Sequence, residues 1–270
     1  MRPPALVRIA ALSVFLSGAL TSAAGAATFQ VDSTADALGN CAVAGQCTLR
    51  QALQSANLTA ERDVVRVPAG TFDLTGQDLI VTMNDAVDVI GAGAGATTLR
   101  EVSGGDGRVF LLEQGSSAAL SGMTLTGSRD ASAILLFGGG VELKASSVVL
   151  RGNRAPRGGA IDATGGSVTL EDSTLTANTA TERGGAIHLG GPASALTLRN
   201  TTVSGNTAPA GSGISVAAGA VDVSFTTLWG NGGAAGELDI APGASARLSA
   251  AILGACSGAA PVSGGGNVAG

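Results

Sequence analysis

The apolar residues of this chain alternate with polar residues over short runs. Residues 168–170, 196–198 and 221–223 each place two aliphatic side chains on one face, and glycine, asparagine or serine bounds the runs. A period of two is typical of short β-strands with one buried face. The chain offers about three such runs between successive landmarks, so the pattern predicts an all-β protein made of many short strands.

These runs belong to a repeat of 25 to 28 residues. Ile161, Ile187 and Ile214 end three related tetrads, of which the first two read Gly-Gly-Ala-Ile. A second series places asparagine three residues after an aliphatic residue, at Asn153, Asn178, Asn206 and Asn231. A third series consists of Leu170, Leu198, Val223 and Leu248. Because all three series share this repeat length, they predict a solenoid in which equivalent residues of consecutive coils stack.

Stacking follows from what a single repeat lacks. A unit this small cannot bury its own inner face, and its strands need neighbours for their backbone hydrogen bonds. If the coils wind in one direction, each strand pairs in parallel with its equivalent one coil on, about 4.8 Å away. The repeats therefore predict a single-stranded parallel β-helix with three strands per coil over residues 63–255.

The asparagine series fits the corners of such a fold. Asparagine tolerates left-handed backbone angles, and its amide can bond to the amides of the coils above and below. We interpret Asn153, Asn178, Asn206 and Asn231 as a structural turn ladder. The paired glycines permit tight corners where a Cβ would clash.

One helix is predicted ahead of the strands. Thr48 and Gln51 have the spacing of a capping box, and a four-residue apolar stripe follows at helical spacing: Leu49, Ala52, Leu53 and Ala56. An amphipathic helix can cover the open end of the first coil. We therefore expect residues 28–62 to form an N-terminal cap.

The start of the chain has the order of a secretory signal peptide. Arg2 and Arg8 precede an apolar run over 9–20 and small residues over 24–27. The run is too short to span a bilayer, so we predict cleavage near residue 27 and a mature chain without a membrane span. In an oxidising compartment we expect Cys41 and Cys47 to pair, and Cys256 to stay single. Residues 256–270 are expected to be a glycine-rich tail.

The composition of the chain argues against several classes of ligand. The net charge of −5 argues against nucleic acid, and no residue spacing indicates a metal or cofactor. Aromatic residues make up 3% of the chain and none is tyrosine, so platforms for sugar rings are few.

Residues 47–53, Cys-Thr-Leu-Arg-Gln-Ala-Leu, resemble the CSLREA-type signature of secreted bacterial β-helix proteins. The Gly-Gly-Ala-Ile tetrads and the aliphatic-x-x-Asn series are similar to repeats of polymorphic outer-membrane proteins, with leucine or valine where phenylalanine is usual. The resemblance covers residue 29 to the end. It implies a right-handed, pectin-lyase-like β-helix outside the cell, and it supplies no catalytic residues. It also leaves open that this chain is a shortened relative.

Two arrangements carry candidate chemistry. Asp162, His188 and Ser215 each follow a tetrad isoleucine, so we expect them in one outward column with the residue types of a catalytic triad. A polar residue is expected at any outward position, so we assign no catalytic residue. The residues that could serve a polysaccharide lyase are Asp162, Glu171, Asp172, Arg157, Arg183 and Arg199. The competing interpretation is an outward charge ladder of Lys144, Glu171 and Arg199.

The sequence thus favours a secreted or cell-surface scaffold, adhesin-like, that binds an extracellular ligand without catalysis. The ligand class is a polysaccharide or a cell-surface protein. The alternative is a polysaccharide lyase or glycoside hydrolase acting on an extracellular polysaccharide, and a structural spacer is a third interpretation.

Overall fold

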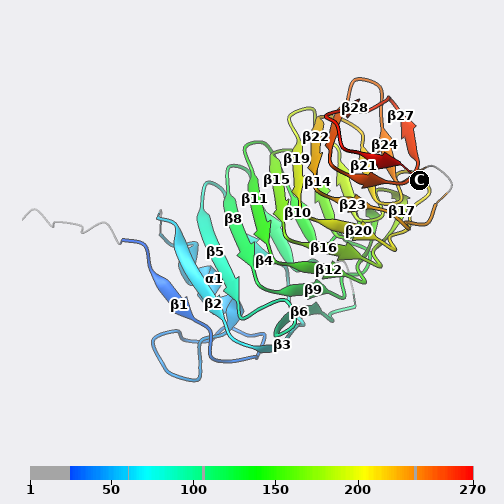
Figure 1. Cartoon of the computed structure of the whole chain (residues 1–270). Helices are drawn as coiled ribbons and strands as arrows, with labels where there is room; N and C mark the ends of the chain where they lie inside the picture. Colours follow the sequence, from blue (N-terminus) through cyan, green and yellow to red (C-terminus); the bar gives the residue numbers. More distant parts are fainter. Residues whose placement is uncertain (1–24, 60, 105–106, 234–235, 270) are drawn as a thin grey trace, which may run out of the picture.

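The computed structural model describes residues 25–59, 61–104, 107–233 and 236–269. It is one elongated stack of short strands, with the N-terminal segment at one end and the C-terminus at the other (Figure 1). The predicted signal peptide lies outside the described residues up to residue 24. Within these ranges, no helix has both the length and the apolar character that a bilayer crossing requires.

Three parallel sheets run along the stack. Sheet 1 consists of β1 (Thr28–Gln30), β2 (Asp63–Val67), β5 (Ala86–Gly91), β8 (Ser117–Ser121), β11 (Glu142–Ser146), β15 (Ser167–Glu171), β19 (Ala195–Arg199), β22 (Ala220–Ser224), β25 (Ser245–Ser249) and β28 (Val262–Ser263). Sheet 2 consists of β3 (Gly70–Leu74), β6 (Thr97–Glu101), β9 (Thr124–Thr126), β12 (Val149–Arg151), β16 (Thr174–Thr176), β20 (Thr202–Ser204), β23 (Thr227–Leu228), β26 (Ile252–Leu253) and β29 (Val268–Ala269). Each coil passes from sheet 1 to sheet 2 to sheet 3.

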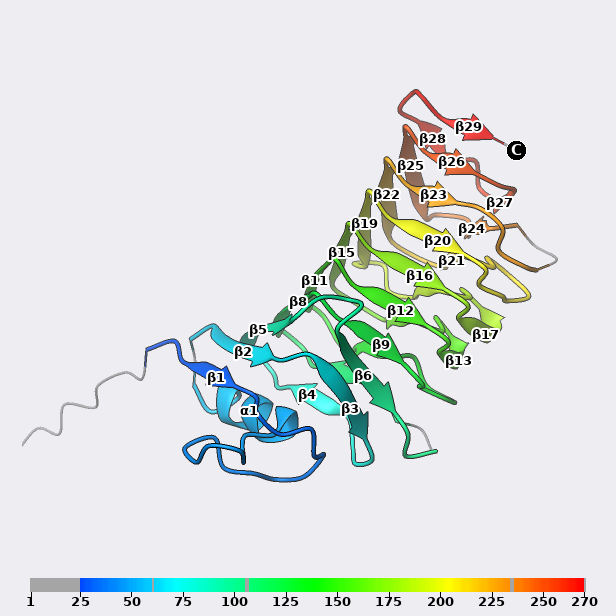
Figure 2. The ribbon, with the colours of Figure 1, turned by 60° about the horizontal axis from the view of Figure 1, so that its bottom comes forward.

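Sheet 3 completes each coil. Its members are β4 (Leu79–Val81), β7 (Phe110–Leu112), β10 (Ile134–Leu136), β14 (Ile161–Ala163), β18 (Ile187–Leu189), β21 (Ile214–Val216), β24 (Leu238–Ile240) and β27 (Cys256–Gly258). Two coils add a short strand between sheets 2 and 3, namely β13 (Arg154–Arg157) and β17 (Thr179–Arg183), which pair as sheet 4. Figure 2 shows this pair at the side of the stack, beyond β12 and β16. The predicted parallel β-helix with three strands per coil is confirmed.

The core is made of stacked inward columns. Ile161, Ile187 and Ile214 are register partners on neighbouring strands of sheet 3, and each is 0% exposed. Each buried isoleucine contributes about 2 kcal/mol of apolar burial. Gly158 and Gly184 begin the tetrads with left-handed φ values of 53° and 66°, and a Cβ on either would overlap the backbone of its tetrad isoleucine. The Gly-Gly-Ala-Ile repeat therefore encodes a corner followed by a core strand.

The predicted charge ladder is wrong at one of its three members. Glu171 is opposite Arg199, and their side chains approach to 3.7 Å. Lys144 instead lies opposite Thr169 and pairs with Glu142 at 2.9 Å. Leu143 lies opposite Val168, two residues before Leu170, and a slip of two residues keeps every side chain on the same face, so an alternating pattern does not reveal it.

The four asparagines form a buried ladder. Asn178 is 0% exposed, and its Nδ2 donates to Asn206 Oδ1 (2.9 Å) and to the Leu150 carbonyl (3.0 Å). Its Oδ1 accepts from the backbone nitrogen (3.1 Å) and the Nδ2 (3.0 Å) of Asn153. The left-handed backbone expected at the asparagines lies one residue earlier, for example at Ala177 (φ 55°). That residue turns the chain so that the asparagine side chain points inward.

The N-terminal cap has the predicted parts. Helix α1 (Leu49–Ala56) buries its apolar stripe against β1, β2 and β4, and the Cys41–Cys47 disulfide precedes it. Thr48 Oγ1 accepts from the Gln51 backbone nitrogen at 3.1 Å. The Gln51 side chain does not return the bond, because it donates to Ser55 Oγ at 3.1 Å, so the capping box is half formed.

The expected glycine-rich tail is instead a further coil. Strands β27, β28 and β29 extend sheets 3, 1 and 2 by pairing with β24, β25 and β26. Glycine at 264–266 suits the corner between β28 and β29, where Gly265 and Gly266 have φ values of 95° and 69°. Cys256 begins β27 as an exposed free thiol.

Candidate functional site

The outer face of sheet 3 carries one column of side chains that points away from the core. On β4, β7 and β10 the outward residues are Ile80, Leu111 and Leu135, which are register partners and half-buried. The next outward residue is Asp162 on β14, followed by His188 on β18. The column therefore changes from aliphatic to polar between β10 and β14.

Three adjoining depressions form a groove along the aliphatic part of this column. The first, of about 210 Å³, lies between α1 and β4, and it shares Asp78 and Ile80 with the second, of about 360 Å³. The second shares Arg108 with the third, of about 290 Å³, which is lined by Leu135 and Asp162 among others. We call this continuous surface the sheet 3 groove.

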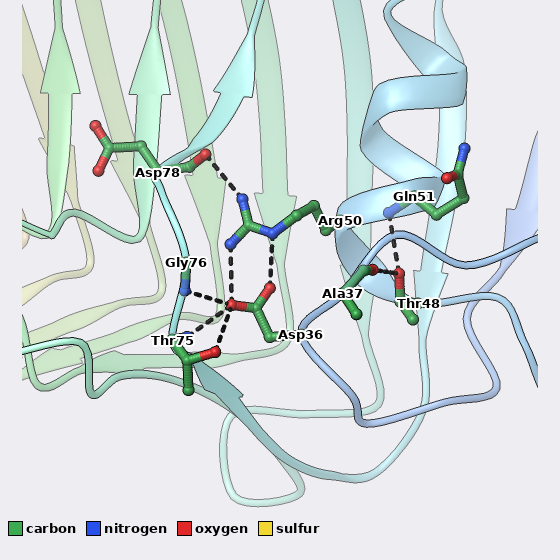
Figure 3. Close-up of polar contacts among 8 residues, drawn as sticks. All are labelled: Asp36, Ala37, Thr48, Arg50, Gln51, Thr75, Gly76 and Asp78. Carbon is green, nitrogen blue, oxygen red and sulfur yellow. Dashed lines mark hydrogen bonds and ion pairs between the residues drawn. The ribbon is translucent and has the colours of Figure 1, made fainter.

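Ion pairs fix one wall of the groove. Asp36 binds Arg50 of α1 at 2.7 Å and also accepts from the Gly76 backbone nitrogen at 2.8 Å (Figure 3). Arg50 in turn donates to the Asp78 carbonyl at 3.2 Å. The Asp78 carboxylate accepts from the backbone nitrogen (2.9 Å) and Nη1 (3.1 Å) of Arg108. Since these groups come from the cap and from two coils, the network holds the groove in shape without a ligand.

Unpartnered polar atoms gather at the far end of the groove. Asp162 is 7% exposed, and its Oδ1 has no hydrogen-bond partner. Burial raises the pKa of Asp162 to about 6, although the guanidinium of Arg157, 3.7 Å away, works in the opposite direction. The Nε of Arg108 is likewise buried without a partner. The Phe137 side chain is 62% exposed and lines the same depression.

Asp162, His188 and Ser215 are brought together in register, as the repeats predict, but they do not form a triad. Ser215 Oγ and His188 Nδ1 are both buried without a hydrogen-bond partner, so the serine hydroxyl is not bonded to the imidazole, which instead meets the backbone of Ser215. Burial, with Arg157 and Arg183 nearby, lowers the pKa of His188 to about 4. All three residues lie at the outward positions of their strands, but they are buried and not exposed to solvent.

The lyase candidates divide between two places. Arg157 and Arg183 end β13 and β17, beside Asp162 and His188. Glu171 ends a strand of sheet 1, Asp172 is exposed at the corner behind it, and Arg199 pairs with Glu171. In the described part of the chain, no three His, Cys, Asp or Glu side chains converge closely enough to hold a metal ion.

A further depression, of about 430 Å³, lies on the outer face of sheet 1. Its floor is made of small residues such as Ala119 and Ser146, and its charged groups are already engaged: Asp88 binds Arg62 at 2.7 Å and Lys144 binds Glu142 at 2.9 Å. None of the residues that line this depression has a buried side-chain atom without a hydrogen-bond partner. The sheet 3 groove is therefore the stronger candidate.

Sequence reasoning missed most of the groove. Ile80, Leu111 and Leu135 lie in the early coils, where the repeat is degenerate, and Asp78 and Arg108 are far apart in sequence. A signal was present in the runs 79–81, 110–112 and 134–136, where three apolar residues in a row replace the usual alternation. An apolar residue at the outward position of a strand indicates an exposed apolar surface.

No known family profile and no curated protein matches this chain. Solved structures that are similar to it include two that can be described. One is described as ORF18 of Geobacillus virus E2, with 12% identity over 81% of this chain and a TM-score of 0.36. The other is the catalytic unit of a thermostable GH87 α-1,3-glucanase from Streptomyces thermodiastaticus strain HF3-3, with 17% identity over 80% of this chain and a TM-score of 0.34. The chain spans 55% and 52% of those two structures, and these distant likenesses carry no argument about function.

Proposed function

We propose that the protein is a secreted or cell-surface β-helix scaffold that binds a neutral extracellular polysaccharide in the sheet 3 groove. The observation that carries the proposal is a groove of three adjoining depressions, with Ile80 and Leu135 in its lining, whose far end is lined by Asp130, Asp162 and the exposed ring of Phe137. A sugar chain offers both complements, because its rings have apolar faces and its edges carry hydroxyl groups. Ligand sites commonly combine an apolar lining with a few placed polar groups.

The position of the groove argues against a peptide ligand. Extended peptides often bind by adding a strand to a free sheet edge, where main-chain hydrogen bonds supply affinity. The groove lies on the face of sheet 3, and β7 and β10 are paired on both sides. A peptide there would leave its own backbone groups without strand partners, whereas a polysaccharide has no such requirement.

Charge indicates that the polysaccharide is neutral. Every guanidinium that lines the groove has a carboxylate partner: Arg50 with Asp36, Arg108 with Asp78, and Arg157 with Asp162. Asp130 lines the third depression as an additional carboxylate. No cation is left over for a uronic acid, so an acidic chain would be repelled rather than held. This argues against the lyase alternative, whose substrates are acidic.

The test is binding of the purified chain to a panel of soluble neutral polysaccharides: laminarin, dextran, xylan and galactomannan, with polygalacturonate as the acidic comparison. We expect binding to at least one neutral polymer, and Phe137→Ala should weaken it about fivefold, since an aromatic contact contributes about 1 kcal/mol. Phe225→Ala is the matched control, because Phe225 is 67% exposed and lies outside the groove. Preference for polygalacturonate, or equal loss in both variants, would contradict the proposal.

A further inference from the structure

We propose that the bond between Ala26 and Ala27 is the processing site of this chain, and that the α-ammonium group released there binds the buried carboxylate of Asp63. The inference concerns the N-terminal end of the stack, where β1 begins at Thr28 (Figure 1), and it does not depend on the sheet 3 groove. It starts from one contact. The Ala27 backbone nitrogen lies 2.6 Å from Asp63 Oδ1, and Asp63 is 0% exposed.

Asp63 occupies a position of the core. It is the first residue of β2, and it is buried on the same face of the strand as Val65 and Val67. Its register partner on β5 is Val87, which is also 0% exposed. A carboxylate among such neighbours requires a proton or a positive partner, because apolar surroundings disfavour the charged form.

No positive side chain supplies that partner. In the described ranges, Asp63 forms no ion pair with a lysine, arginine or histidine. The hydrogen bonds to its carboxylate come from the Thr59 hydroxyl to Oδ2, at 2.6 Å, and from the Ala27 nitrogen to Oδ1. Of these two donors, only the Ala27 nitrogen becomes a cation when the chain is cut in front of it.

A second buried carboxyl group lies nearby. Asp85 directly precedes β5, is 5% exposed, and its Oδ2 has no hydrogen-bond partner. Burial raises the pKa of Asp85, and the charge of Asp63 raises it further, although a hydrogen bond from the Ala86 nitrogen acts in the opposite direction. A positive charge at Asp63 would therefore also relieve the repulsion between the two carboxyl groups.

The sequence and the contact select the same bond. Signal peptides are cut after small residues at the third and first positions ahead of the bond, and Ala24 and Ala26 have that spacing. Ala26 is exposed, whereas Ala27 is half-buried. A cut one residue later would leave Thr28 first and would remove the nitrogen that donates to Asp63.

Cleavage changes the chemistry of the contact. A signal peptidase of the exporting cell adds water across the amide bond. The Ala26 carbonyl carbon takes the hydroxyl group and ends as a carboxylate. The Ala27 nitrogen keeps the electron pair of the broken bond and receives the two protons that the water and the new carboxyl group release. Since an α-amino group has a pKa of about 8, the product at neutral pH is an ammonium ion.

The new terminus stays beside Asp63. The Ala27 carbonyl accepts from the Val64 nitrogen at 2.9 Å, and Thr28 is paired with Val64 in the sheet. A neutral amide with one N–H group is thereby exchanged for a cation with three, and a charged donor binds a carboxylate about twice as strongly as a neutral one. The uncut chain is therefore the less stable form.

The first experiment identifies the terminus. The full chain is exported to the periplasm of a bacterial host, and mass spectrometry of the purified protein gives its first residue. We expect Ala27. An exported protein that begins at Thr28 or at any other residue, or that is not cut, overturns the inference.

The second experiment measures what the charge contributes. Chains 27–270 and 25–270 are released from a fusion partner by a protease that leaves no residue behind, and each is unfolded in urea at pH 7 with the disulfide intact. Both contain Ala27, but its nitrogen is an ammonium only in the shorter chain. We expect the unfolding equilibrium constant of the shorter chain to be smaller by about tenfold, since a hydrogen bond to a charged group stabilises more than a neutral one. Equal constants overturn the inference.

Two variants and the pH assign the effect to Asp63. Asp63→Asn keeps an acceptor for Ala27 but removes the charge, so the two chain lengths should then be equally stable. Asp88→Asn is the matched control, because Asp88 pairs with Arg62 on the outer face, and the tenfold difference should persist there. The ion pair raises the pKa of the α-amino group, so the difference should be complete below about pH 8 and disappear at higher pH. A difference that survives in Asp63→Asn overturns the inference, and if that variant does not fold, the two chain lengths with Asp63 still decide.

Discussion

The outer face of sheet 3 is open on its first coils and covered on its later ones. On β4, β7 and β10 the outward residue is aliphatic and half-exposed, whereas on β14, β18 and β21 it is polar and buried. This reverses the usual rule that outward positions are polar and buried positions apolar. An open aliphatic column and a buried polar one are both unfavourable to the free protein, and they meet at Asp162.

The covered coils differ from the open ones between sheets 2 and 3. β12 and β16 are followed by the asparagine ladder and by β13 and β17, whose last residues are Arg157 and Arg183. The earlier coils have no such strand in the described ranges. The groove therefore lies on the coils ahead of the asparagine ladder, and its polar end, at Asp162, adjoins the first coil of the ladder.

Breaking the ladder should show how much of the covered half depends on it. Asn178→Ala removes both donors and the acceptor of a fully buried side chain, which takes one bond from the Leu150 carbonyl and leaves the Asn153 backbone nitrogen without the acceptor that it has in the ladder. We expect the free energy of unfolding to fall by about 3 to 5 kcal/mol. Urea denaturation measures it. The exposed Asn200, changed to glycine to keep its left-handed backbone, should cost less than about 1 kcal/mol, and equal losses would contradict a special role for the ladder.

Asp162 and His188 should make the free energy of unfolding depend on pH in opposite directions. Asp162 keeps its proton up to about pH 6 in the folded chain but loses it near its ordinary value of 3.8 when unfolded, so its contribution to stability falls as pH rises between those values. His188 stays neutral down to about pH 4 when folded but gains its proton near 6.5 when unfolded, so its contribution rises with pH over the same window. Each effect amounts to about 3 kcal/mol.

Replacing either residue should reveal the pH dependence that the other one causes. Asp162→Asn should leave a stability that rises steeply from pH 4 to pH 6, and His188→Gln one that falls over the same range. The wild-type chain should be nearly flat, because the two terms oppose each other. Thermal denaturation at several pH values measures all three. A flat profile in both variants would show that neither group titrates differently in the folded chain.

The open half should tolerate polar substitution. Leu135→Ser exchanges an outward, half-exposed leucine that lines the groove, and we expect the free energy of unfolding to change by less than about 1 kcal/mol. The neighbouring Leu136 points inward and is 0% exposed, so Leu136→Ala should cost about 2 to 5 kcal/mol. If Leu135→Ser is as costly as Leu136→Ala, the column is core and the groove is closed. Polysaccharide binding should respond to Leu135→Ser alone.

The repeats predict the fold well because each periodic landmark has one structural meaning. The tetrad isoleucines stack in register, and residues of the segment 47–53 supply a disulfide, an N-cap, a buried stripe and the Arg50 ion pair. Lys144 was misplaced because a two-residue slip leaves the alternating pattern unchanged.

The site was harder to predict. That Asp162 and His188 are outward on their strands follows from the repeat, but their burial does not, and the strands β13 and β17 beside them occur in only two of the described coils. The Asp78–Arg108 ion pair joins residues of different coils in the irregular part of the chain. Neither feature has a period, so neither could be read from the alternation.

The asparagine ladder also bears on how the molecule comes apart. Each of its inner members is bonded to the members before and after it, at separations of 25 and 28 residues, so one coil cannot loosen without exposing polar groups on two others. Local unfolding should therefore begin at the terminal coils and proceed one coil at a time, and not start within the middle of the stack. Backbone amides near Asn178 should accordingly exchange with solvent more slowly than those of the first and last coils. The centre of the stack is then the most rigid part of the molecule, and it supports the coil that carries Asp162.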